Sequence, residues 1–139
     1  MVEEFEADLP DQPTVAAEIR AILFRDLDLF WERRDFMRVS VSQGTIDEEI
    51  GHTISTNLND QRVRSMLEKL RRHQASGGIR PETDVEAIAY TLSALGFSIG
   101  FVLQSSFGKD RDLARRIMTG AAQALSDGIS PTPGEEQTR

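Results

Sequence analysis

The stretch AIAYTLSALGFSIGFVLQSSFG, residues 87–108, contains no charged side chain, although 28% of the residues in this 139-residue chain are charged. A helix at the surface of a soluble protein carries polar or charged residues on its solvent side. We therefore expect this segment to form a helix that other parts of a protein cover on nearly all sides.

On a helical projection the stretch divides into three faces. The main aliphatic face contains Val85, Ile88, Leu92, Leu95, Ile99, Val102 and Leu103. A strip of small residues beside it contains Ala89, Ser93, Gly96 and Gly100. Nearly opposite the aliphatic face lie Tyr90, Phe97 and Phe101. Two large apolar faces on one helix predict packing partners on both sides.

A membrane span is the alternative interpretation of the same stretch. An uncharged run of this length can cross a bilayer, and Gly96-x-x-x-Gly100 is a motif of paired membrane helices. Against a span, the run contains Thr91, four serines and Gln104, and no basic cluster flanks it. We expect a soluble helical bundle with no membrane partner.

Composition narrows the class of protein further. The net charge is −7, so the chain lacks the basic excess with which proteins bind nucleic acid. The absence of cysteine excludes disulfides and thiolate metal sites and fits a reducing compartment. The acidic N-terminus lacks the pattern of a secretory signal. We expect a cytoplasmic protein that does not itself contact nucleic acid.

The pattern predicts further helices before this stretch. One runs from about Thr14 to Arg34, with Asp11 or Thr14 as its N-cap. Residues 35–43 alternate in a way that fits a short strand or a short helix, and we predict a helix because no second strand candidate exists. Thr45 and Glu48 form a capping box for the next helix. Its apolar face changes direction, which predicts a kink near Asn57–Asp60.

The second half of the chain has its own start and stop signals. Gly77 and Gly78 are typical of a helix end. Thr83 and Glu86 form a second capping box. Asp110 is the expected N-cap of the last helix, and Gly128 is expected to end it in the left-handed conformation.

These signals together predict one all-α domain, an antiparallel bundle of five to six helices, over residues 13–129. Residues 1–12 are an acidic lead-in or the end of a linker helix, and residues 130–139 are a disordered tail.

Catalytic and metal chemistry find little support in the sequence. Glu49 and His52 form one Glu-x-x-His pair, whereas a di-iron bundle needs two such pairs and two further glutamates. The other histidine, His73, has no carboxylate at that spacing and is expected at the surface or an edge. No nucleophile elbow or serine triad is present. We expect no enzyme, no catalytic residue, no metal and no cofactor.

The runs MLEKLRRHQASG (66–77) and GGIRPETDVEAIAYTLSALGFSIGFVL (77–103) resemble the C-terminal regulatory domain of TetR-family transcriptional repressors. The segments 35–43 and 111–129 fall where that family has helices, so the resemblance covers nearly the whole chain. Family members begin with a basic helix-turn-helix domain, for which this chain has no counterpart. We expect either a truncated chain or an effector-binding domain that stands alone, with DNA binding confined to a full-length parent.

The resemblance implies a homodimer and a small apolar effector inside the bundle. The last two helices would form a four-helix interface between subunits. The interface candidates are Ala89, Ser93, Gly96, Gly100, Leu103, Leu113, Ile117, Gly120 and Ala124. The ligand-binding candidates are Phe24, Trp31, Met37, Val41, Met66, Tyr90, Phe97 and Phe101. An all-α dimerisation module with a solid core and no ligand is the alternative.

Overall fold

The computed structural model describes residues 9–131, and within that range every regular element is helical. The prediction of an all-α fold is confirmed. The expected acidic lead-in and polar tail fall largely on residues 1–8 and 132–139, which lie outside the described part of the chain. The elements are α2 (Val15–Glu32), α3 (Arg34–Ile46), α4 (Glu48–Ile54), the π-helix η1 (Ser55–Asp60), α5 (Gln61–Ala75), α6 (Val85–Phe97), the π-helix η2 (Ser98–Val102), α7 (Leu103–Ser105) and α8 (Arg111–Ile129).

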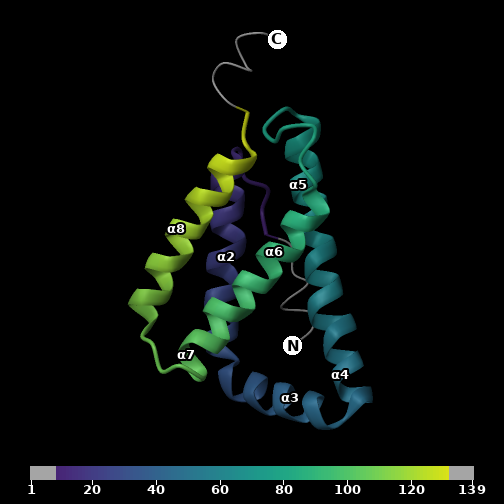
Figure 1. Ribbon diagram of the computed structural model, residues 1–139, viewed down its shortest axis with the longest axis vertical. Coiled ribbons are helices and arrows are strands. Elements are labelled where there is room, and N and C mark those ends of the chain that lie inside the picture. The colour runs from purple at the N-terminus through teal and green to yellow at the C-terminus, as the bar shows by residue number, and fades with distance from the viewer. Residues whose placement is uncertain (1–8, 132–139) are drawn as a thin grey trace.

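Helix α2 is the centre of the bundle. It packs along α8, along α6 with η2, and against α5, as Figure 1 shows. Helix α3 runs across the lower end of the view and leads into the continuous helical run α4–η1–α5. This arrangement places α3 at one end of the space between α2, α6 and the α4–α5 run.

The apolar stripe of α2 repeats at helical spacing and is fully covered. Ile19, Leu23 and Leu27 have no exposed surface, and they pack with Leu92 of α6 and Met118 of α8. Burial of an aliphatic side chain of this size contributes roughly 1.5–3 kcal/mol relative to its exposed state. The stripe therefore holds three helices together from one side.

Two carboxylates interrupt the stripe of α2 and are also buried. Glu18 accepts a hydrogen bond from Nη2 of Arg72 at 2.6 Å and lies 3.2 Å from Nε2 of His73. Asp26 pairs with Arg62. Because a buried carboxylate needs a partner, these contacts fix how α5 lies on α2. His73 is therefore a buried residue, and its predicted place at the surface is wrong.

Three helix boundaries lie at the residues that the sequence predicted. Thr14 accepts from the amide of Ala17, and Asp110 accepts from the amide of Leu113, so both are N-caps. Gly77 follows α5 with a φ of 89°, in the left-handed region that only glycine adopts without strain. The predicted short helix at residues 35–43 is confirmed as part of α3.

Three other helix ends were predicted at the wrong residue. Asp47 caps α4 by accepting from the amide of Glu49, because α3 continues past Thr45. Asp84 caps α6 in place of Thr83, since its carboxylate reaches the amide of Ala87. Helix α8 continues through Gly128 to Ile129 without a left-handed residue.

Two π-helical segments interrupt the long helices. The segment η1 covers the predicted kink at Asn57–Asp60 and accounts for the change in direction of the apolar face. The segment η2 divides the uncharged helix, which the pattern does not predict. Such segments insert one residue into a turn and are frequent at functional sites.

The strip of small residues on the uncharged helix faces other helices of the same chain: Gly96 and Gly100 face α2, whereas Ser93 contacts α5 and η1. Ala89, Ser93, Gly96 and Gly100 are all buried there. A β-carbon at position 100 would lie 3.1 Å from the ring of Phe30. Their burial within one chain argues against the predicted interface between subunits at these four positions. Gly96 and Gly100 allow α6 and η2 to approach α2 closely.

The run Val85–Ser105 is long and apolar enough to cross a membrane by length and composition alone. In this fold 44% of its most apolar window is buried inside the bundle. The buried central helix of a bundle passes the same test, so this finding weighs little in favour of a span.

Candidate functional site

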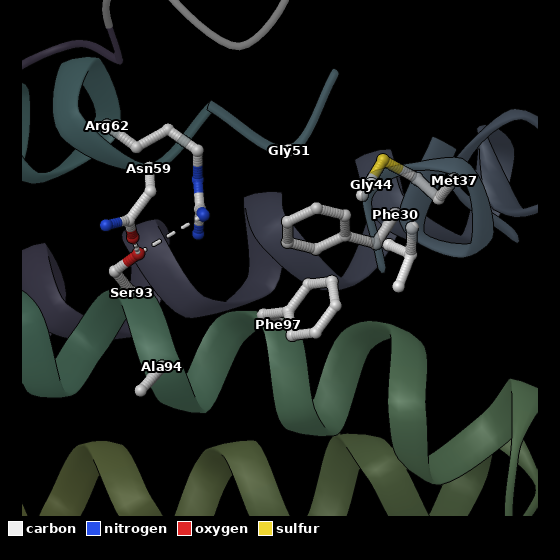
Figure 2. A pocket seen from close by; sticks show the side chains of 10 residues that line it. Phe30, Met37, Gly44, Gly51, Asn59, Arg62, Ser93, Ala94 and Phe97 are labelled. Atoms are coloured by element: carbon white, nitrogen blue, oxygen red, sulfur yellow. Dashed lines mark hydrogen bonds between the residues drawn. The ribbon is translucent and has the colours of Figure 1, made fainter. Parts of the chain in front are cut away.

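An apolar pocket of about 350 Å³ lies between α2, α3, the α4–η1–α5 run and α6. Its volume is within the range of small-molecule sites, roughly 300–1,000 Å³. Figure 2 shows the side chains around it. The lining residues are Phe30, Met37, Val41, Gly44, Gly51, Asn59, Arg62, Ser93, Ala94 and Phe97.

Aromatic rings form the apolar end of the pocket. The ring of Phe97 meets that of Phe30 edge to face, with centroids 5.9 Å apart. Phe101 packs behind Phe97 at 5.5 Å, and together with Met37 it completes a small apolar cluster separate from the main core. Edge-to-face contacts of this kind hold rings in one orientation. This wall of the pocket is therefore preformed.

Three polar side chains meet at the other end, as Figure 2 shows. Nη1 of Arg62 donates to Oγ of Ser93 at 3.3 Å, and Ser93 donates to Oδ1 of Asn59 at 2.8 Å. The guanidinium of Arg62 also lies 4.9 Å from the centroid of the Phe30 ring. The pocket thus combines a large apolar surface with a few placed polar groups, as ligand sites do.

Asp26 holds Arg62 from behind the pocket. Its Oδ2 accepts from Nη2 of Arg62 at 2.5 Å, and both side chains are buried. Burial raises the pKa of Asp26, and the charge and hydrogen bond of Arg62 oppose that rise. A carboxylate paired in this way fixes the guanidinium while balancing its charge.

Three of the eight predicted ligand-binding residues lie at this pocket, namely Met37, Val41 and Phe97. Phe101 is buried one layer behind it. Whether these residues bind a ligand stays a prediction, but the structure brings them to one cavity from α3 and α6.

The other four candidates lie elsewhere and do not line the pocket. Phe24 stacks under Arg20 in an open groove beside α8, and Trp31 stacks under Arg34. Met66 belongs to the main core, and Tyr90 is half-exposed. The projection misplaced Phe24 and Trp31 because it could not show that α6 approaches the opposite side of α2.

Seven lining residues were not among the predicted ones. They are Phe30, Gly44, Gly51, Asn59, Arg62, Ser93 and Ala94. One signal pointed to the polar end: Asp26 falls within the apolar stripe of α2, where a carboxylate needs a buried cation. Arg62 falls on the same face of α5 as Met66, which makes it the matching candidate.

The predicted interface residues of α7 and α8 are exposed or partly exposed. Ile117 is 36% exposed, Ala124 is exposed, and Leu103 and Leu113 are half-buried. A β-carbon at Gly120 would have no neighbour within 4 Å. These five residues remain candidates for contact with a second subunit.

The described residues contain no group of three or more histidine or acidic side chains placed to hold a metal ion. His52 is exposed on α4.

No protein-family model matches the chain, and comparisons with curated proteins and with solved structures found no significant match. The resemblance to the TetR family therefore stays a hypothesis that rests on the sequence pattern alone.

Proposed function

We propose that this chain is the effector-sensing and dimerisation domain of a TetR-like transcriptional regulator and binds a small apolar ligand inside its helical bundle. The observation that carries the proposal is the pocket of about 350 Å³, which is walled by Phe30, Met37 and Phe97. Its largely apolar lining with a few placed polar groups is typical of a small-molecule site.

The position of the pocket supports a sensing role. Its walls come from α2 and α6, which form the core, and from α3 and α4, which lie at the end of the bundle. A ligand that contacts all four would favour one relative position of these helices over another. Such a shift is the means by which a bound effector changes the rest of a regulator.

The dimer is proposed to form through the exposed side of α8. Leu113, Ile117 and the small residues Gly120 and Ala124 follow one side of that helix. Small residues let helices from two subunits approach closely, and a symmetric pair of such surfaces closes a dimer. We propose no catalytic activity and a cytoplasmic location for the domain.

A thermal-shift measurement with a panel of uncharged apolar compounds tests the ligand-binding part. We expect at least one compound to raise the unfolding temperature in a saturable manner, because a ligand that binds only the folded state stabilises it. Sedimentation velocity without detergent tests the dimer. A monodisperse dimer whose unfolding temperature no compound changes would favour the alternative, a dimerisation module with no ligand.

A further inference from the structure

The polar end of the pocket offers hydrogen-bond donors and few acceptors. Oδ1 of Asn59 already accepts from Ser93, and Oγ of Ser93 already accepts from Arg62. Nε of Arg62 is buried and has no hydrogen-bond partner. Nδ2 of Asn59 forms no hydrogen bond with the described residues. Because Nε of Arg62 has no surface open to the pocket, the donors left for a ligand are Nδ2 of Asn59 and the guanidinium N–H groups of Arg62 that Ser93 and Asp26 do not use.

The same end carries no unbalanced charge. The guanidinium of Arg62 is neutralised by Asp26 at 2.5 Å, and both groups are shielded from water. A ligand carboxylate would bring a second anion to a site where one already accompanies the cation. A ligand ammonium would meet Arg62 itself. Because burial of an unpaired charge is costly, both kinds of charged ligand are disfavoured.

From these two observations we infer that the pocket selects uncharged apolar molecules that carry a hydrogen-bond acceptor, such as a carbonyl oxygen, over fatty carboxylates and amines. The acceptor meets the donors of Asn59 and Arg62, and the hydrocarbon part lies against Phe30 and Phe97. This inference rests on the proposed function, since it names the chemical class of the ligand for the same pocket.

Calorimetric titration with three matched probes tests the inference. Methyl nonyl ketone, undecanoate and undecylamine have similar hydrocarbon chains and differ in charge and in hydrogen-bonding groups. We expect the ketone to bind at least about tenfold more tightly than either charged probe at neutral pH. Undecanoate binding as tightly as the ketone would overturn the inference while leaving a ligand-binding pocket in place.

Two variants locate the contact. Asn59→Leu removes one donor and should weaken ketone binding several-fold, whereas Gln123→Leu, an exposed position on α8, should leave it unchanged. If Asn59→Leu leaves the affinity for the ketone unchanged, the proposal that Asn59 donates a hydrogen bond to the ligand is overturned. If none of the three probes binds, both the inference and the proposed ligand-binding function fail.

Discussion

The carboxylate of Asp26 occupies the space that a β-carbon at position 96 would fill. A β-carbon built on Gly96 would lie 2.1 Å from Oδ2 of Asp26, far inside contact distance. The same oxygen accepts the hydrogen bond of Arg62. The absence of a side chain at Gly96 therefore allows the ion pair that positions the polar end of the pocket.

Gly96→Ala should destabilise the fold, because the added methyl group forces Asp26 away from Arg62. Overpacking of this kind costs about 1–3 kcal/mol in free energy of unfolding. Gly128→Ala is the matched control, since Gly128 lies in the last turn of α8, is exposed and has open space around it. That control should gain about 0.5–1 kcal/mol. Urea denaturation measures both, and equal effects of the two substitutions would contradict this account of Gly96.

Arg62→Met and Asp26→Asn should each destabilise the fold at neutral pH. Each change leaves one buried group without the partner that balances its charge, and breaking a buried pair in this way costs about 3–5 kcal/mol. Combining the two should recover much of the stability lost in Arg62→Met. The prediction fails if the double variant is as unstable as the sum of the single losses.

Asp26 should also give stability a particular pH dependence. Because burial raises the folded-state pKa of Asp26 above 3.8, the folded chain holds the proton more tightly than the unfolded chain. The contribution of Asp26 to the free energy of unfolding is therefore most favourable at low pH. It falls as the pH rises from the pKa of the unfolded chain through the raised pKa of the folded chain. The difference in unfolding free energy between wild type and Asp26→Asn, measured from about pH 4 to about pH 8, should decrease with pH. A difference that increases would show a lowered pKa.

The class of fold could be predicted because its signals are local. Thr14, Asp110 and Gly77 mark helix boundaries through contacts within a few residues, and the apolar periodicity of α2 identifies its buried face. Likewise, the change of face near Asn57 indicated the break that η1 provides.

The site was predicted only in part because it depends on which helix approaches which side of another. Met37, Val41 and Phe97 were recognised as candidates from their own helices. Ser93 and Gly96 were assigned to a second subunit, since a strip of small residues signals close approach without saying to what. Arg62 was overlooked because an arginine next to an apolar stripe is usually solvated, and only its pairing with Asp26 shows otherwise.

The proposed dimer can be tested at the exposed side of α8. Ile117→Lys should convert the dimer to a monomer, because a charge would be placed in the centre of the apolar contact. Thr119→Lys introduces the same residue on another side of the same helix and should leave the dimer intact. Sedimentation velocity reports the outcome. Dissociation by both variants, or by neither, would place the interface elsewhere.

The pocket itself is the central claim, and a titration with Nile red, an uncharged apolar fluorophore, tests it most directly. Val41 lines the pocket, whereas Val39 on the same helix is 62% exposed. The wild-type chain and Val39→Trp should bind the dye with the same saturable rise in fluorescence, and Val41→Trp, which fills the pocket, should not. Undiminished binding by Val41→Trp, or no saturable binding by the wild-type chain, would contradict the account.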